Sequence, residues 1–358
     1  MEEVMAASKP LVLTLDAAAI NENQKKKNFI NWKDFVVGSG LRAREKKLVC
    51  VTAGNSYLGS HLLKQLLAHS YLVRVIIQHQ VNLEDMRELV SDEEMNKLES
   101  VVVAKMADLD SLGDAFSGCY AVFHTSSFID PHGVSGYSEQ MVFLETEAAR
   151  NVIGACGRAS VKKCIFTSSL LASIWNGNMI DRVIDESCWS NEQFCIENKL
   201  WLALGKTAAE KLAWKMSKEL NVKLVTVCPG LLMAPSFPNA HTETSFPYLK
   251  GGKAMLQQGL LATADVKNVA KAHVHLYEAM NSGACGRYFC FDRVIQSLEE
   301  AIELENALKR PGFLTRERQE DVTEQTDEIV NSKLSNSRLS RLLSQPSQLL
   351  SCKHMLIL

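Results

Sequence analysis

A turn between an apolar run and a helical run has the composition of a phosphate-binding loop. Residues 48–53 read LVCVTA, which is typical of a buried strand, and small residues lead from there into a helix that opens near Leu58. The N–H groups at a helix N-terminus and the helix dipole favour an anion, so a dinucleotide pyrophosphate is the expected ligand. The residues predicted around it are Ala53, Gly54, Ser56, Tyr57, Leu58 and Gly59. The alternative is an ordinary strand–helix turn.

The end of the next strand normally selects between the two nicotinamide dinucleotides. Residues 71–78 form a second predicted strand that ends at Gln78. An acidic side chain there would bind a ribose 2′-hydroxyl, and an arginine would bind a 2′-phosphate. Gln78 does neither strongly, so it leaves NAD and NADP undecided.

Two later strand ends provide further candidate cofactor residues. Asp108 and Leu109 follow the third strand, where the adenine ring would lie. Asp108 could equally cap the helix that begins near Ser111. Thr125 and Ser126 end the fourth strand, near the expected nicotinamide ribose.

Strand-like and helix-like runs alternate along the middle of the chain. The predicted strands are 48–53, 71–78, 101–106, 121–127, 162–169 and 222–230. The predicted helices between them are 60–70, 83–98, 139–159 and one that contains 202–206. This alternation predicts an α/β fold with a doubly wound parallel sheet of the Rossmann type. Right-handed crossovers would then place the ligand at the carboxyl ends of the strands.

The pattern changes at both ends of the chain. Residues 1–46 are expected to be a poorly ordered extension before a dinucleotide-binding domain of residues 47–310. Residues 233–252 contain prolines and glycines and are expected to form a long loop. A helix (266–280), a strand (286–291) and a helix (297–309) should follow. We expect a smaller substrate-binding part, mainly 231–262 and 281–310.

The polar tail, residues 311–358, has two interpretations. Leu334, Leu339, Leu342 and Leu343 alternate with basic residues and could form a short basic amphipathic helix. A loosely ordered tail is the simpler interpretation, because short helices are marginal without packing.

The composition excludes several classes of protein. The 358 residues are 46% hydrophobic with a net charge of −2, which allows a sizeable core and suggests no nucleic-acid partner. No apolar run approaches the roughly 20 residues that span a bilayer. Acidic residues near the N-terminus argue against a signal or transit peptide. The 10 cysteines lack metal-ligand spacing, so we expect reduced thiols, no metal and a cytoplasmic protein.

The histidines are expected to have structural roles. His273 and His275 lie two positions apart on a predicted helix and therefore on different faces, which argues against a metal pair. His124 ends a buried strand and is expected to pack there. Cys164 and Cys228 lie in core strands, where cysteine behaves as a small hydrophobe.

Three segments occur in an order and spacing that resemble a known family. They read VFHTSS (122–127), CIFTSS (164–169) and DESCWSNEQFCIENKLWLALGK (185–206). Together they closely resemble the cinnamoyl-CoA reductases, and more widely the dihydroflavonol reductases, both extended short-chain dehydrogenases. The similarity runs from about Lys47 to about Leu308. It implies a Rossmann-type fold, NADP(H) as cofactor with NAD as the alternative, and reduction of an aromatic acyl thioester of the phenylpropanoid type.

The resemblance also implies residue roles. Ser169, with Ser168 beside it, corresponds to the serine that hydrogen-bonds the substrate carbonyl. Lys206 corresponds to the lysine that binds the nicotinamide ribose and lowers the pKa of the catalytic tyrosine. Pro229 corresponds to the proline beside the nicotinamide ring.

The chain departs from the family at the position of the proton donor. The family motif is Tyr-x-x-x-Lys, and its tyrosine corresponds to Leu202. The family's first two loop glycines correspond to Ala53 and Ser56, and its 2′-phosphate arginine to Gln78. Leu202 lies one helical turn before Lys206 and can neither donate nor accept a proton.

A missing general acid typically lowers a rate on the order of 10²–10⁴-fold. Thioester reduction is a partial exception, because a thiolate leaving group needs less protonation than an alkoxide. Three hypotheses remain: a reductase with weakened chemistry, an inactive dinucleotide-binding sensor or partner-binding module, and a structural domain without cofactor. The first is our prediction, since the family's chemistry is the only concrete activity that the sequence suggests.

Overall fold

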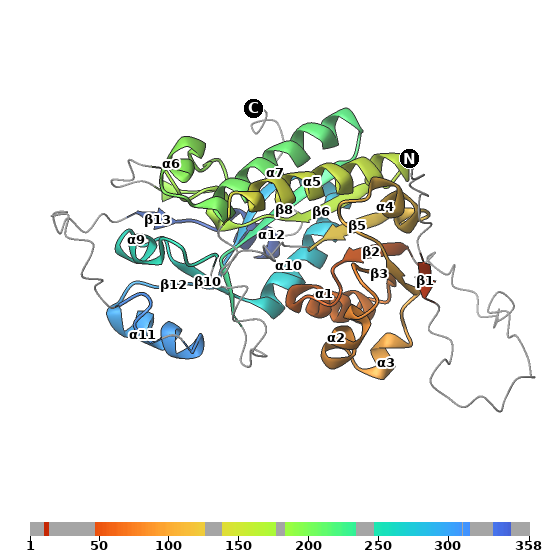
Figure 1. The fold of residues 1–358 in the computed structure, drawn as a ribbon, viewed down its shortest axis with the longest axis horizontal. Coiled ribbons are helices and arrows are strands. Elements are labelled where there is room, and N and C mark those ends of the chain that lie inside the picture. The colour runs from red at the N-terminus through yellow and green to blue at the C-terminus, as the bar shows by residue number, and fades with distance from the viewer. Residues whose placement is uncertain are drawn as a thin grey trace, which may run out of the picture.

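The computed structural model of the chain describes residues 11–13, 47–125, 138–176, 183–233, 247–309, 311–315 and 332–344. A central sheet lies between two groups of helices (Figure 1). Its strand order is β1-β4-β3-β2-β5-β6-β8-β11. The strands are β1 (Leu11–Leu13), β2 (Leu48–Thr52), β3 (Leu72–Ile77), β4 (Ser100–Val103), β5 (Ala121–His124), β6 (Lys163–Thr167), β8 (Lys223–Pro229) and β11 (Gly286–Cys290).

All pairs among these strands are parallel except one. β1 pairs antiparallel with β4, with Leu11 opposite Val103, so part of the expected N-terminal extension forms an edge strand. The parallel strands are buried on both faces, as Val49, Cys50 and Val51 of β2 show with 0% exposure each. Burial on both faces explains why these strands appear in the sequence as continuous apolar runs. The predicted doubly wound parallel sheet is confirmed.

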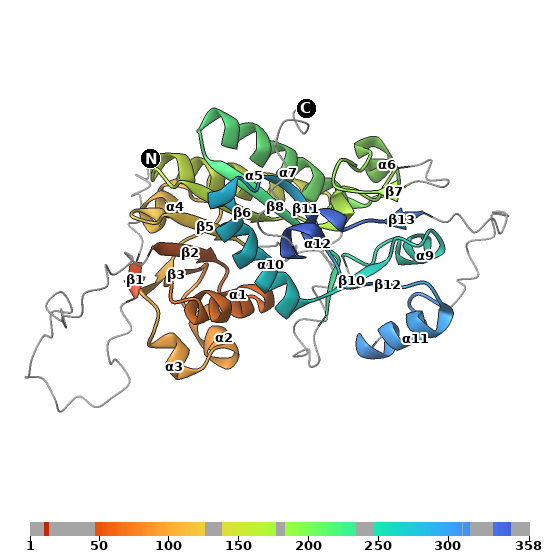
Figure 2. The ribbon, with the colours of Figure 1, turned by 180° about the vertical axis from the view of Figure 1, so that it is seen from behind.

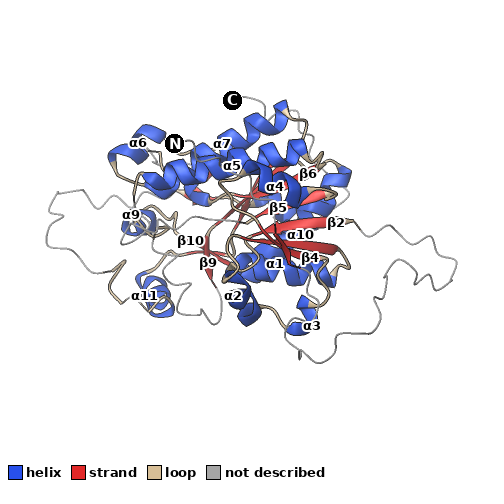
Figure 3. Cartoon of the chain, turned by 45° about the vertical axis from the view of Figure 1, so that its right-hand side comes forward, coloured by secondary structure: helices blue, strands red, loops and turns tan. Residues whose placement is uncertain are grey.

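Helices cover both faces of the sheet (Figure 3). α4 (Leu109–Phe116), α5 (Gln140–Arg158) and α7 (Trp201–Glu219) cover one face, and α1 (Tyr57–Ala68) and α10 (Val266–Ala279) the other. The helix predicted at 83–98 is wrong in its extent. It is two helices, α2 (Asn82–Leu89) and α3 (Asp92–Met95), because Val90 is extended and Ser91 starts a new helix with a capping box to Glu94.

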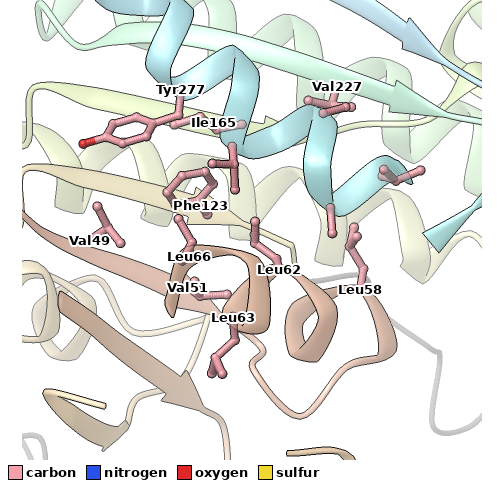
Figure 4. Close-up of a cluster of buried hydrophobic side chains, with 14 of the residues drawn as sticks. Val49, Val51, Leu58, Leu62, Leu63, Leu66, Phe123, Ile165, Val227 and Tyr277 are labelled. Carbon is pink, nitrogen blue, oxygen red and sulfur yellow. The ribbon is translucent and has the colours of Figure 1, made fainter. Parts of the chain in front are cut away.

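The packing of α1 shows how the sequence period builds the core. Leu58, Leu62 and Leu66 recur every four residues and lie on one face of the helix, where each is at most 4% exposed. They lie in one cluster with Val51 of β2 and Phe123 of β5 (Figure 4). Burying each such side chain contributes about 1.5–3 kcal/mol. The contacts hold the first strand–helix unit in place, and the candidate cofactor loop is part of that unit.

A smaller part adjoins the carboxyl edge of the sheet. It has a three-stranded sheet of β9 (Leu231–Met233), β10 (Ala262–Asp265) and β12 (Arg293–Val294), and a core of its own that includes Leu171 and Leu261. It also contains η1 (Leu170–Ala172), α6 (Glu192–Glu197), α9 (Gly252–Gln257) and α11 (Leu298–Ala307).

One segment of the predicted substrate-binding part lies in the central sheet. Residues 286–290 were expected in that part, but they form β11, which pairs with β8 in the central sheet, with Tyr288 opposite Val227. The short helix η2 (Met280–Ser282) leads into that strand from α10. The predicted 233–252 loop falls largely on residues outside the described part of the chain.

The described part of the tail is packed rather than loosely ordered. β13 (Lys333–Leu334) pairs in parallel with β7 (Val183–Ile184), and α12 (Ser337–Ser344) lies beside β11 (Figure 2). Leu339 and Leu342 are 5% and 8% exposed within the main core. The guanidinium of Arg338 lies 4.7 Å from the ring centroid of Tyr288. The amphipathic helix is therefore confirmed, and its apolar face packs on the protein itself.

Two predictions from composition can be compared with the structure. Among the described residues, no helix is long and apolar enough to cross a membrane. Eight of the described cysteines are free and seven of those are buried, but Cys285 is in a disulfide, so the expectation of reduced thiols is wrong at that position.

Candidate functional site

The candidate residues meet at one edge of the sheet. β2 and β5 are neighbours, with Val51 opposite Phe123, although the chain leaves β2 for β3 on the other side. Such a reversal of strand order is where open α/β sheets bind ligands. Because the strands are parallel, the residues that follow β2, β3, β4, β5, β6 and β8 share this edge, as predicted.

Close packing within the protein requires the small residues of the turn after β2. A Cβ on Gly54 would lie 2.1 Å from Cγ1 of Val75, and one on Gly59 would lie 2.2 Å from the carbonyl oxygen of Ala53. Neither position can accept a side chain without rearrangement. Ala53 has a φ of 52°, in the left-handed region that glycine adopts more easily. Ala53 thus has a backbone conformation that a glycine would adopt with less strain.

The N-terminus of α1 points from this turn toward the carboxyl edge. Ser56 caps the helix, and its Oγ accepts the N–H of Gly59 at 3.0 Å. Tyr57 begins the helix with its ring 4.8 Å from that of His61, and burial raises the pKa of its phenol. Leu58 packs in the core (Figure 4). The first turn contains no acidic side chain, so this helix end suits an anion, with one donor already used by Ser56.

The residues predicted near the adenine have clear local roles. Gln78 follows β3 directly and is half-buried. Asp108 caps α4, because one carboxylate oxygen accepts the N–H groups of Asp110 at 3.0 Å and Ser111 at 3.2 Å. Leu109 packs toward α5, where a Cβ on Gly154 would be 3.1 Å from its Cδ1. The capping interpretation of Asp108 is confirmed, and contact of these residues with a dinucleotide stays a prediction.

Thr125 binds the neighbouring strand. Its N–H donates to Oγ1 of Thr52 at 3.1 Å, and its hydroxyl donates to the carbonyl oxygen of Thr52. These bonds join the ends of β2 and β5, where the nicotinamide ribose was predicted. Ser126 lies outside the described residues.

The two serines after β6 have different partners. Ser168 donates to a carboxylate oxygen of Glu210 at 2.6 Å and is 4% exposed. Ser169 caps η1, since its Oγ accepts the N–H of Leu171 at 3.2 Å. Ser169 Oγ acts only as an acceptor in this cap. Its hydroxyl hydrogen can therefore donate to a carbonyl oxygen.

Leu202 and Lys206 lie on the first turns of α7. Leu202 is half-buried and packs against the core of the smaller part. Lys206 is 6% exposed. Pro229 ends β8 opposite Cys290 of β11 and is buried. The elements that carry Ser169, Lys206 and Pro229 lie together, because α7 and β8 both contact η1 and β6 pairs with β8.

The ammonium of Lys206 is held by a carboxylate that the sequence reasoning missed. Its Nζ donates to Oε2 of Glu145 on α5 at 2.9 Å, with side chains 8% and 3% exposed. The helices approach closely because Gly205 has no side chain, and a Cβ there would be 3.3 Å from the carbonyl oxygen of Met141. Burial, and next the positive charge of Lys206, lower the pKa of His124 to about 3. Lys206 is therefore the charged centre of a buried polar cluster.

A second buried ion pair was also missed. Glu210 of α7 is 0% exposed and accepts from Ser168, from Thr226 at 2.5 Å and from Nε of Arg287 at 2.9 Å. Arg287 also donates to Ser173 Oγ at 2.7 Å. Together these bonds fix the segment that carries Ser168 and Ser169 against β8 and β11. A charged residue on the apolar face of α7, beside Ala209 and Ala213, is the sequence signal that could have indicated it.

Sequence comparison with known proteins identifies the family of this chain. The model of the 3-beta hydroxysteroid dehydrogenase/isomerase family matches residues 50–296. "Cinnamoyl-CoA reductase 1" of Petunia hybrida is 36% identical over 261 residues, which cover 71% of this chain and 75% of that protein. The chain belongs to the cinnamoyl-CoA reductase group of this family. The chain is also similar to "Tetraketide alpha-pyrone reductase 1" of Arabidopsis thaliana. The two are 32% identical over 73% of this chain and 81% of that protein.

Solved structures agree with the fold of this group. Vestitone reductase from alfalfa, Medicago sativa, aligns with a TM-score of 0.59 and 24% identity over 87% of this chain and 96% of its own. Yeast methylglyoxal/isovaleraldehyde reductase, complexed with NADPH, aligns with a TM-score of 0.63 and 18% identity over 83% and 93%. These matches confirm the Rossmann-type fold that the sequence predicts for this chain.

Proposed function

We propose that the protein is an NADP(H)-dependent reductase of an aromatic acyl thioester or a related carbonyl, acting in the cytoplasm with weakened catalysis. Membership of the cinnamoyl-CoA reductase group is the observation that carries the proposal. The packing of Gly54 and Gly59 and the acid-free N-terminus of α1 fit a dinucleotide pyrophosphate. Gln78 supplies no cation for a 2′-phosphate, so NAD is the alternative cofactor.

The chain's own residues would have defined tasks in this reaction. A bound reduced nicotinamide supplies hydride. The hydroxyl of Ser169 can donate to the substrate carbonyl oxygen as negative charge develops there. Lys206 has three N–H donors and gives one to Glu145, so two remain for the ribose hydroxyls of a bound nucleotide. Leu202 contributes no proton, which is why thioesters with a thiolate leaving group are the favoured substrates.

The second candidate is a dinucleotide-binding protein without turnover, used as a sensor or a partner-binding module. The buried pair of Lys206 with Glu145 favours it, because the charge of the lysine is neutralised by a carboxylate rather than directed only at a ligand. Leu202 favours this candidate as well, because it lies on the same helix face as Lys206 and cannot act as a general acid.

Dinucleotide binding is tested first. We would titrate the protein with NADPH and NADH and follow nicotinamide fluorescence. Saturable binding supports both candidates. The lack of any response at millimolar concentrations would leave only a structural role.

Turnover is tested with feruloyl-CoA and related thioesters by following NADPH oxidation. The key variant is Leu202→Tyr, and its matched control is Leu202→Phe, which adds an aromatic ring without a hydroxyl. A gain of one to several orders of magnitude in the tyrosine variant alone is expected if the acid was the missing part, since a general acid contributes on the order of 10²–10⁴. Background rates from the unsubstituted protein, together with clear cofactor binding, would exclude the reductase for those substrates.

A further inference from the structure

The partner of Lys206 lies on a different helix from the position where a phenol would be. Glu145 is on α5, 61 residues before Lys206, and its Oε2 is 2.9 Å from the ammonium. In a Tyr-x-x-x-Lys site the lysine charge acts on the phenol one turn before it. Here Leu202 occupies that turn, so the ion pair that the structure contains runs between α7 and α5.

Two observations and one physical argument make this pair a built feature. Both side chains are more than nine-tenths buried, with exposures of 8% and 3%. Gly205 permits the close approach of the helices, since a Cβ on it would be 3.4 Å from Cγ of Glu145. A buried ammonium left unpaired would be strongly disfavoured, so a lysine without a phenolate needs a carboxylate nearby.

We propose that Glu145 is a positioning residue that serves as the counter-ion of Lys206, so that Lys206 cannot activate a phenol at position 202 while Glu145 is charged. The inference rests on the proposed function only in treating Lys206 as the nicotinamide-side lysine. It means that a phenol introduced at position 202 could donate its own proton but would not have its pKa lowered by the charge of Lys206.

The charges explain the expected behaviour. Positions 202 and 206 are one helical turn apart and share a face, so a phenol at 202 lies near the ammonium. An isolated positive charge within about 4–6 Å lowers an acid's pKa by about 1–3 units. The Lys206–Glu145 pair is neutral as a whole, so most of this effect is cancelled.

The experiment measures the pKa of an introduced phenol by ultraviolet difference titration against the parent protein. Leu202→Tyr alone should titrate at or above the ordinary range of tyrosine. The variant Leu202→Tyr with Glu145→Gln should titrate at least about one unit lower, because the amide has the same shape but no charge. The matched control is Glu147→Gln in the same background, since Glu147 lies on α5 but pairs with Arg150 at 3.0 Å. It should leave the phenol unchanged.

A third variant covers the case in which Glu145→Gln alone does not fold. Leu202→Tyr with both Glu145→Gln and Lys206→Met contains no buried charge from the pair. Its phenol should titrate within about half a unit of Leu202→Tyr alone, because a neutral pair has been replaced by neutral residues. Near-ultraviolet circular dichroism confirms the fold of each variant.

Two results would overturn the proposal. One is an equal phenol pKa with and without Glu145→Gln in folded protein. The other is a rise of more than about one unit in the triple variant, which would show that Lys206 acted on the phenol despite Glu145. Neither measurement uses cofactor or substrate. A failure to bind NADPH would therefore reject the proposed function and leave this inference to be decided by the titration.

Discussion

Lowering the pH from 7 to 5 should destabilise the fold through two buried histidines. His124 and His273 are 2% and 0% exposed. Burial is the main cause that lowers the pKa of His124 from 6.5 to about 3 and that of His273 from 6.5 to about 4. Nδ1 of His273 donates to the carbonyl oxygen of Val269 at 2.8 Å, so Nε2 accepts from the hydroxyl of Thr167 at 2.8 Å. A proton on Nε2 would remove that acceptor.

The loss of stability at low pH follows from a difference in proton binding between the folded and the unfolded chain. Below pH 6.5 the unfolded chain binds a proton at each histidine, whereas the folded chain does not until the pH approaches 4 or 3. Stability is therefore present above 6.5 and is lost as the pH falls. Each histidine lowers the free energy of unfolding by about 2 kcal/mol between pH 7 and pH 5, or about 4 kcal/mol together. The figure depends little on the folded values, since both lie well below 5.

The assay is urea unfolding at pH 7 and pH 5 for the parent protein and for His273→Gln. Glutamine keeps a donor and an acceptor but does not titrate, so the pH-dependent loss of stability should shrink by about 2 kcal/mol. His275→Gln is the matched control, because His275 is exposed on the same helix. A loss of stability that is the same in His273→Gln as in the parent would refute the reasoning.

Two further predictions concern the loop and the second ion pair. Gly54→Ala places a Cβ 2.1 Å from Cγ1 of Val75, so it should destabilise the fold by about 1–3 kcal/mol or more and weaken dinucleotide binding. The control Gly113→Ala has open space around the new Cβ and should do neither. Equal melting temperatures of the two variants would contradict this prediction. Arg287→Met leaves the fully buried Glu210 without its cation and should cost about 3–5 kcal/mol in thermal or urea unfolding. Adding Glu210→Gln should recover much of that loss, and no recovery would argue against a charge effect.

Short-range patterns predicted the parallel strands of the central sheet and most of the long helices, because those elements depend on local periodicity. The run LVCVT of β2 and the leucines of α1 show their buried faces in the sequence itself. Prediction failed where one local signal or one distant contact intervened. The capping box at Ser91 divides the helix expected at 83–98. β11 joins the central sheet because it pairs with β8, about which its own residues carry no information.

The candidate site divides in the same way. Residue types and spacing alone predicted the turn from Ala53 to Gly59, and the family resemblance singled out Ser169, Lys206 and the missing acid at Leu202. These predictions rest on residues close together in the chain, where strand, turn and helix restrict each other directly. The comparisons confirm the family, while the roles of the individual residues stay predictions.

Only the tertiary structure decided which charges meet. Glu145 and Lys206 lie on separate helices, and they pair because Gly205 lets α5 and α7 approach closely. Glu210 and Arg287 are 77 residues apart and meet because α7 packs across the strands of the sheet. A sequence shows that such residues carry charge, but their buried partners depend on how helices and strands pack, and a buried charge must have a partner.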